Sequence, residues 1–506
     1  MKKLKISALA IATVILLSFA AGCGAGNNRA PVSDEKNDDV NATVGQTPHK
    51  DSDVGAFENP FVSTADNPIS TLSADVDTAS YAYFRKLCNL GYSLTDLKNQ
   101  MKGSPLRTEE MVNYFDYSYT MPAEGEIFGV KAEIAKTPWN ENSHLLTVGI
   151  ATSKSTERIP NNLVFLIDVS GSMSSSDKLP LLKKAFGSLV SALDEHDTVS
   201  IVTYSGKEEV VLSGCSGNKT DEIMAAVNAL VPSGSTNGEA GLTKAYALAK
   251  DYYKENGNNR IILASDGDLN VGISSPEELK SYISEKRDEG IYLSVLGFGT
   301  GNYKDSAMSA IAQNGNGVYY YIDGESEAQK VLGTDILSTL YTVAKDVKLQ
   351  LTFDPAFVSS YRLIGYENRI LNTEDFLDDT KDAGDVGAGH SVTVCYELIL
   401  TDGATEEYSE PSKFASLGIS YKLPSESESI LEEYSIDSGS VTDTPSSDFT
   451  FISAVIETAM IINESKYNEK NVGLSDVRAL INSADISGDA DKSEFLQILT
   501  KLSEDK

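Results

Sequence analysis

The hydrophobic pattern of this sequence is organised around an apolar run that ends in a cluster of oxygen-bearing side chains. Residues 163–173 read LVFLIDVSGSM, so five apolar residues lead directly into Asp168. Such a run is typical of a strand that is covered on both faces of a parallel sheet. Gly171 permits a tight turn, which places the hydroxyls of Ser170 and Ser172 beside the carboxylate. The pattern therefore predicts a set of hard oxygen donors at the carboxyl end of a buried strand.

Two later stretches add donors of the same kind. Residues 234–236 form a small polar loop that ends in Thr236, just before a predicted helix over residues 239–253. Residues 260–265 (RIILAS) predict a second buried strand, which ends at Asp266. Because ligands in an open α/β sheet bind outside the carboxyl ends of the strands, we expect these side chains to converge on one cation. The first motif alone is equally typical of a capped turn before a helix.

The three motifs, taken in order, resemble the metal-ion-dependent adhesion site of von Willebrand factor type A (vWA) domains. That family has Asp-x-Ser-x-Ser, then Thr, then Asp-Gly, and the matching residues here are Asp168, Ser170, Ser172, Thr236 and Asp266. The resemblance implies a bound Mg²⁺, and the residues leave Mn²⁺ and Ca²⁺ open. It also implies that an acidic side chain of a partner protein completes the coordination of the metal.

The pattern around these motifs predicts an α/β fold with a doubly wound, mostly parallel, Rossmann-like vWA sheet over residues 159–345. Further strands are expected at 199–204, 209–212, 291–298 and 318–322, and further helices at 178–193, 221–230, 276–289 and 305–314. Ser175 and Lys178 have the spacing of an acylating-serine motif. We discount that chemistry because no Ser-Asp-Asn or Lys-Thr-Gly accompanies them.

Two further folded segments flank the vWA segment. Residues 71–158 predict a small α+β unit, and residues 346–506 predict short strands of an antiparallel sandwich followed by helices. The stretches SADVDTASYAYFR, EEMVNYF and PWN resemble the amino-terminal extension of a family of bacterial vWA lipoproteins. The stretches YRLIGYENR and DAGDVGAGHSVTVCYEL resemble the carboxy-terminal domain of the same family.

The beginning of the chain predicts export and a membrane anchor. Residues 1–22 combine three lysines with an apolar stretch, as a signal sequence does. Cys23 follows Ala-Ala-Gly, which resembles a bacterial lipobox whose cysteine becomes lipidated. Residues 23–70 are poor in large apolar residues and predict a disordered tether. We therefore expect a lipid-anchored protein on the extracytoplasmic face of the cell membrane, with secretion and cleavage nearby as the alternative.

The charge and the cysteine content of the chain limit the kinds of ligand that it is expected to bind. The net charge is −32, which disfavours nucleic acid and anionic lipid headgroups as ligands of a basic face. The cysteines after Cys23 are Cys88, Cys215 and Cys395, which form no zinc spacing and no disulfide framework.

The candidate chemistry favours binding over catalysis. The site motifs supply two carboxylates, which about neutralise a divalent ion, and they place no base beside a nucleophile. The histidines are His49, His144, His196 and His390, and none is near the motifs in sequence. We expect a protein-binding adhesion or scaffold module and no enzyme. Two alternatives stay open: a metal-dependent hydrolase with Asp168 as nucleophile, and a structural envelope protein in which the metal stabilises the fold.

Overall fold

The computed structural model of the chain describes residues 58–74, 77–153, 159–235, 238–267, 276–299, 305–336, 342–404, 412–424 and 426–504. The chain divides into two units, residues 1–52 and 53–506, and every described residue lies in the second unit. The predicted signal sequence, Cys23 and the tether up to residue 57 lie outside the described residues, as does Thr236.

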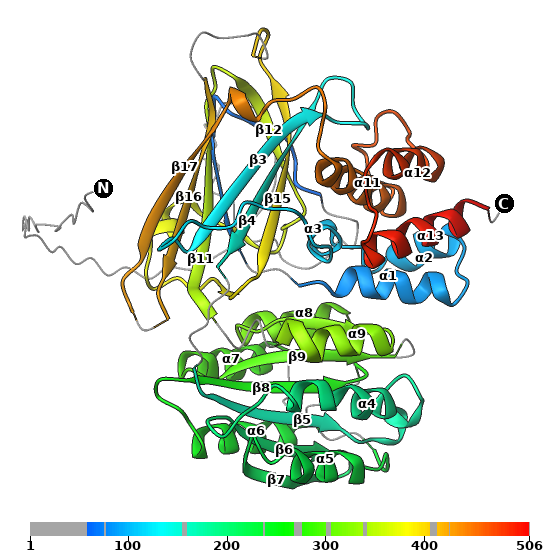
Figure 1. Cartoon of the computed structure of the whole chain (residues 1–506), viewed down its shortest axis with the longest axis vertical. Helices are drawn as coiled ribbons and strands as arrows, with labels where there is room; N and C mark the ends of the chain where they lie inside the picture. The colour runs from blue at the N-terminus through cyan, green and yellow to red at the C-terminus, as the bar shows by residue number, and fades with distance from the viewer. Residues whose placement is uncertain are drawn as a thin grey trace, which may run out of the picture. The chain divides into compact units, whose positions relative to one another are not determined.

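A six-stranded sheet forms the centre of the segment around the candidate site (Figure 1). Its strands are β5 (Asn161–Asp168), β6 (Thr198–Tyr204), β7 (Glu208–Ser216), β8 (Asn258–Ser265), β9 (Tyr292–Phe298) and β10 (Tyr319–Ile322). The spatial order is β10-β9-β8-β5-β6-β7, and all pairs are parallel except β6–β7. Every residue of β5 and β8 is buried, as their apolar sequences predict.

Helices cover both faces of this sheet. Leu163 and Phe165 of β5 share a core with one set of helices, and Val164 and Leu166 share a core with another. The first set is α4 (Leu179–Val190), α5 (Thr220–Ala229) and α9 (Glu325–Lys330), which continues into η2 (Val331–Asp335). The second set is α6 (Gly238–Asp251), α7 (Pro276–Asp288) and α8 (Asp305–Asn314). The predicted doubly wound α/β fold is therefore confirmed.

Two antiparallel sheets, separate from the central sheet, enclose a shared apolar core. One has the order β1-β12-β15-β4-β3, and its strands are β1 (Val62–Ser63), β12 (Val358–Ile364), β15 (Ser391–Leu400), β4 (His144–Thr152) and β3 (Phe128–Lys136). The other has the order β13-β2-β11-β16-β17, with β13 (Ile370–Leu371), β2 (Ile69–Ser73), β11 (Thr342–Phe353), β16 (Lys413–Lys422) and β17 (Ile430–Asp437). β14 (Gly384–Gly387) pairs with β11.

Both sheets combine strands from before and after the central segment. For example, β4 pairs with β15 over eight residues, and β2 pairs with β11 over five. The segments that the sequence analysis treats as separate flanking units, residues 71–158 and 346–506, thus form their sheets together.

The folded part begins before residue 70. The side chain of Asn59 donates to the carbonyls of Leu363 and Gly365, at 3.1 and 2.7 Å, and Val62 pairs with Tyr361 between β1 and β12. The expected disordered tether therefore does not extend to residue 70, because polar residues between 58 and 70 are held by backbone pairing that their composition does not reveal.

Six helices pack beside the sandwich: α1 (Ala79–Asn89), α2 (Leu94–Met101), α3 (Thr108–Asn113), α11 (Ser447–Ile462), α12 (Leu474–Ser483) and α13 (Ala490–Glu504). Nearly all of α11 is buried, so it forms the core of this group. Among the described helices, none has both the length and the apolar character needed to cross a bilayer.

Arg85 joins three helices and the end of β10 through charge. Its guanidinium, which is almost fully buried, bonds to Asp323 at 2.6 Å, Glu327 at 2.7 Å and Glu494 at 3.2 Å. Arg85 lies on α1, Glu327 on α9 and Glu494 on α13, and Asp323 directly follows β10. The same guanidinium donates to the hydroxyl of Tyr114. This Arg85 cluster connects the central segment to the helices on both sides of it in sequence.

We predict that Arg85→Met lowers the free energy of unfolding by about 3–5 kcal/mol, because two buried carboxylates then lose their cation. Urea denaturation followed by circular dichroism measures the change. Lys98→Met is the matched control, since Lys98 forms an exposed pair with Glu464 and should cost less than about 1 kcal/mol. Equal costs for the two variants would contradict the role given to the Arg85 cluster.

Candidate metal site

The two acidic residues of the candidate site end neighbouring strands. Asp168 is the last residue of β5, and Asp266 directly follows β8. These strands pair in parallel register, with Ile167 opposite Ala264, so both carboxylates emerge at the same edge of the sheet. The chain passes from β5 to β6 on one side and later places β8 on the other side, so this edge is the topological switch point where ligands bind in such sheets.

The turn after β5 gathers two hydroxyl groups beside Asp168. The backbone N–H of Ser170 donates to Oδ1 of Asp168 at 2.7 Å. The Oγ atoms of Ser170 and Ser172 lie 2.9 Å apart, and a short helical turn, η1 (Gly171–Ser174), follows. Asp168 and Ser170 are buried, whereas Ser172 is exposed. The site therefore has a buried floor and an opening toward solvent.

Backbone hydrogen bonds hold the second loop against this turn. The N–H of Gly171 donates to the carbonyl of Gly234 at 3.1 Å, and the N–H of Ser233 donates to the carbonyl of Val169 at 2.7 Å. Gly234 has φ +77°, a conformation that favours glycine. The structure thus brings the loop up to Ser235 next to the Asp168 turn. The following residue, Thr236, lies outside the described residues, so its contribution stays a prediction.

The chemistry of the donors fits a hard divalent cation. Oδ1 of Asp266 is buried and makes no hydrogen bond within the described part of the chain, although the residue is only 2 % exposed. A buried carboxylate oxygen without a hydrogen bond is costly, and a cation would relieve that cost. The described residues contain no group of three or more His, Cys, Asp or Glu side chains arranged for a metal. A site here would thus depend on the serine hydroxyls as well as the two carboxylates.

Lys178 is a charged member of the site that the sequence analysis missed. Its Nζ lies 2.7 Å from Oδ2 of Asp266 and donates to the carbonyl of Ser172 at 3.0 Å. The side chain passes close to Gly299, where an added Cβ would lie 2.3 Å from Cε of Lys178. The signal in the sequence was a lysine six residues after Ser172, but spacing alone does not show that it folds back onto Asp266.

Tyr204 is a second neighbour that the sequence analysis missed. It ends β6, lies opposite Asp168 in the strand register, and accepts a hydrogen bond at its carbonyl from the N–H of Val169 at 3.0 Å. Burial raises the pKa of the Tyr204 hydroxyl well above its usual value, and the negative charge of Asp168 raises it further. The phenol therefore stays protonated beside the carboxylate.

A flanking helix contacts the loop that follows the site. Nζ of Lys86 on α1 lies 3.1 Å from Oδ2 of Asp177, and the hydroxyl of Ser175 donates to Oδ1 of the same residue. Burial acts to raise the pKa of Asp177, but the hydrogen bonds from Ser175 and Lys86 outweigh it and lower the pKa. Because Asp177 directly precedes Lys178, α1 is coupled to the edge of the candidate site.

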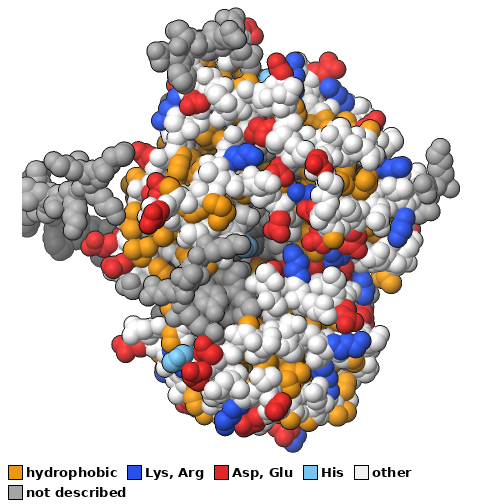
Figure 2. Space-filling model, viewed as in Figure 1, with side chains coloured by type: hydrophobic (Ala, Val, Ile, Leu, Met, Phe, Trp, Pro, Cys, Tyr) orange, Lys and Arg blue, Asp and Glu red, His pale blue; other side chains and the backbone are white. Residues whose placement is uncertain are grey.

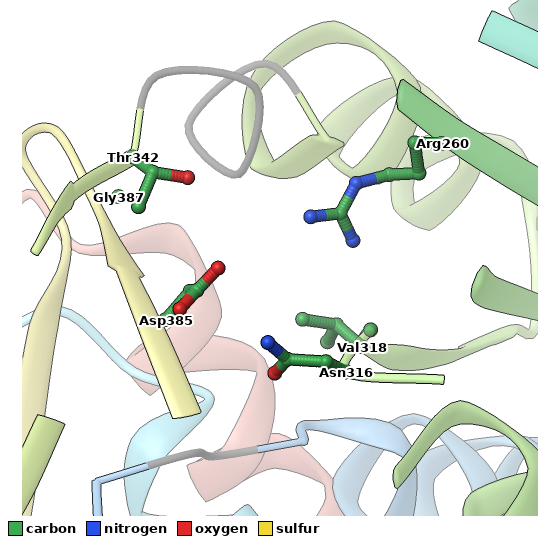
Figure 3. A pocket seen from close by; sticks show the side chains of 7 residues that line it. Arg260, Asn316, Val318, Thr342, Asp385 and Gly387 are labelled. Atoms are coloured by element: carbon green, nitrogen blue, oxygen red, sulfur yellow. The ribbon is translucent and has the colours of Figure 1, made fainter. Parts of the chain in front are cut away.

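Two hollows, that is, surface pockets, lie away from the candidate metal site in the described residues. One, of about 20 Å³, is lined by Arg260, Asn316 and Asp385, and the guanidinium and carboxylate face each other across it in Figure 3. That volume suits a single water molecule. The other, of about 370 Å³, is lined by acidic and basic side chains, of which Arg287 pairs with Asp382 and Lys422 with Asp346. Neither hollow includes a residue of the candidate metal site.

Comparisons with known protein families match nearly all of the chain after the predicted tether. Residues 162–334 match the von Willebrand factor type A domain, and residues 49–147 match a model described as von Willebrand factor. Residues 338–504 match a model described as the C-terminal region of the uncharacterized protein YfbK.

Individual relatives differ in how much of the chain they cover. The uncharacterized protein YfbK of Escherichia coli is 41% identical over 432 residues, which are 81% of this chain and 74% of that protein. The human inter-alpha-trypsin inhibitor heavy chain H3 is 28% identical over 182 residues, 34% of this chain and 20% of its own. A solved von Willebrand factor type A structure from Catenulispora acidiphila covers 76% of this chain and 91% of its own, with 15% identity and a TM-score of 0.43.

We predict that Gly299→Ala destabilises the protein by about 1–2 kcal/mol, since Gly299 has φ +72° and an alanine there is strained. The added Cβ also crowds Lys178. Urea denaturation measures the effect. Gly103→Ala is the control, because nothing lies within 4 Å of its added Cβ, and it should change stability by less than about 0.5 kcal/mol. A neutral Gly299→Ala would show that Lys178 is not held against that backbone.

Proposed function

Because the chain belongs to the YfbK family and carries a vWA domain, we propose that it is a membrane-anchored, extracytoplasmic protein-binding module with a metal-ion-dependent adhesion site. In this function an adhesion or scaffold partner is held through one of its acidic side chains. Mg²⁺ is the proposed metal, and Mn²⁺ and Ca²⁺ are chemically suitable.

One feature supports this function above the others: the buried Oδ1 of Asp266, which has no hydrogen bond in the described residues and lies at the same sheet edge as Asp168. Two carboxylates buried on neighbouring strands repel each other in a medium of low dielectric constant. Lys178 supplies one positive charge to this pair, through Oδ2 of Asp266, so a divalent cation would offset the repulsion that remains. The solvent-exposed Ser172 marks the open side, where a partner can approach.

The residues have distinct proposed roles. Ser170, Ser172 and Thr236 would offer hydroxyl oxygens, and Asp168 and Asp266 would offer carboxylates either directly or through water. A divalent cation bound there supplies positive charge and an incompletely filled coordination shell to which a carboxylate binds. The N–H of Ser170 orients Asp168, and the backbone bonds between Gly171 and Gly234 keep the two loops in register.

The groups around Asp168 support binding rather than hydrolysis. Its neighbours include the backbone N–H of Ser170 and a protonated phenol, Tyr204, and neither of these is a general base. A hydrolase that uses Asp168 as nucleophile would need a second acid where Ser170 stands. His196 is exposed in a loop. If the protein instead has a structural role in the envelope, the metal would bind at the same site and stabilise the fold, and no partner protein would bind to the metal.

Anchoring is proposed from the sequence at Cys23, which lies outside the described residues. Lipidation there would hold the protein on the extracytoplasmic face of the cell membrane. The net charge of −32 disfavours nucleic acid as a partner. On the face shown in Figure 2, the described acidic and basic side chains are interspersed rather than gathered into a broad basic patch.

The contact between Lys86 and Asp177 suggests how the flanking segments contribute to partner binding at the proposed site. It connects α1 to the residue before Lys178, and the Arg85 cluster fixes α1 to α9 and α13. The proposed partner would therefore meet a site whose border is set by the amino-terminal segment.

We predict that Mg²⁺ binds the protein with a stoichiometry near one and that Asp168→Asn weakens this binding by more than about 100-fold, because a buried carboxylate of the site loses its charge. Isothermal titration of Mg²⁺ into protein stripped with EDTA measures both affinities.

Asp221→Asn is the control, since Asp221 is an exposed acid of α5 away from the site, and it should bind as the unaltered protein does. Absent binding, or equal binding by the Asp168→Asn variant, would rule out the proposed site.

A further inference from the structure

Lys178 places a positive charge where the site has a buried negative charge. Its Nζ lies 2.7 Å from Oδ2 of Asp266, and the two side chains are only 14 % and 1 % exposed. An ion pair at that distance and burial is screened little by water. Nζ also donates to the carbonyl of Ser172, so the ammonium bridges the end of β8 to the turn after β5.

The backbone around Lys178 keeps the ammonium in this position. Lys178 directly precedes α4, whose residue Leu182 donates its N–H to the Lys178 carbonyl, and the Lys178 N–H donates to the carbonyl of Ser175. Gly299 leaves room for the side chain, because a Cβ there would overlap Cε of Lys178. The side chain is thus confined on its way to Asp266 rather than free to sample solvent.

The ion pair between Lys178 and Asp266 affects how strongly the site can bind a divalent cation, because it changes the net charge of the site. Asp168 and Asp266 carry two formal negative charges, and the ammonium offsets one of them. A divalent cation at the same carboxylates would face the positive charge of Lys178, because like charges repel strongly in a partly buried site. The ammonium and the cation therefore compete for Asp266.

We propose that Lys178 is a built-in counter-cation of the metal site, whose ammonium neutralises Asp266 through Oδ2 and competes with a divalent cation for that carboxylate. This inference rests on the proposed function, and it adds a regulation of the same site. Asp266 thus has a partner within the chain itself, and the metal affinity is set lower than the two carboxylates alone would give.

The test compares neutral and charged replacements at position 178. Lys178→Gln retains a donor for the Ser172 carbonyl, Lys178→Met retains only bulk, and Lys178→Arg retains the charge. We expect both neutral variants to bind Mg²⁺ about tenfold more tightly than the unaltered protein in isothermal titration, since a charge at this range shifts the binding of a cation to a carboxylate by a factor of about ten or more. Lys178→Arg should stay within about threefold of the unaltered protein.

Thermal unfolding with and without Mg²⁺ gives an independent measurement. In EDTA, the neutral variants should unfold at a lower temperature than the unaltered protein. Mg²⁺ should raise their unfolding temperature by more than it raises that of the unaltered protein, because only the metal then neutralises Asp266. Lys184→Gln is the matched control, since it removes one positive charge from an exposed position of α4 and should leave both quantities unchanged.

The outcomes separate this inference from the proposed function. If the unaltered protein binds Mg²⁺ and the neutral variants bind with equal or weaker affinity, the counter-cation role is wrong and the proposed function stands. If neither the unaltered protein nor any variant binds Mg²⁺, the metal site itself is wrong. Binding by the neutral variants alone would support the counter-cation role and contradict the proposed function.

Discussion

Two buried carboxylates at the ends of neighbouring strands are the constraint on which the rest of this structure depends. Asp168 and Asp266 emerge from β5 and β8, which lie about 4.8 Å apart as paired strands do. Both residues are at most 2 % exposed. Water cannot screen them, so the fold must supply compensating charge and donors. The N–H of Ser170 and the ammonium of Lys178 supply part of that compensation within the protein.

The surrounding architecture fixes those compensating groups in place. The turn after β5 is bonded to the loop before α6, and α4 begins directly after Lys178. Lys86 on α1 then contacts Asp177, while Arg85 on the same helix is held by carboxylates of α9 and α13. A charged interface thus connects the edge of the candidate site to segments about a hundred residues before it and more than three hundred after it in the chain. This continuity explains why the flanking segments and the vWA domain fold as neighbours.

Local patterns in the sequence were sufficient to predict the central sheet, but not every contact. The run LVFLID and the run RIILAS are buried along their whole length in two parallel strands, so their apolar composition identified β5 and β8 correctly. The shared sheets of the sandwich could not be predicted, because β4 and β15 pair across more than two hundred residues and no local period records a partner. The same reason explains why β1 was missed within a polar stretch. At the site, the spacing of Lys178 and Tyr204 along the chain does not show that they lie beside the two acids, since each is brought there by tertiary packing. Thr236 lies outside the described residues, and its role stays a prediction.

The proposed function requires that a divalent cation binds between the loops that carry Asp168 and Asp266. A crystal structure of the protein grown with Mn²⁺, with anomalous difference density measured near the manganese absorption edge, tests it most directly. We expect a single strong peak within coordination distance of the Ser170 and Ser172 hydroxyls and beside both carboxylates, with the Lys178 ammonium moved away from Asp266. Peaks only elsewhere, or an unmoved ammonium with no peak at this edge of the sheet, would contradict it.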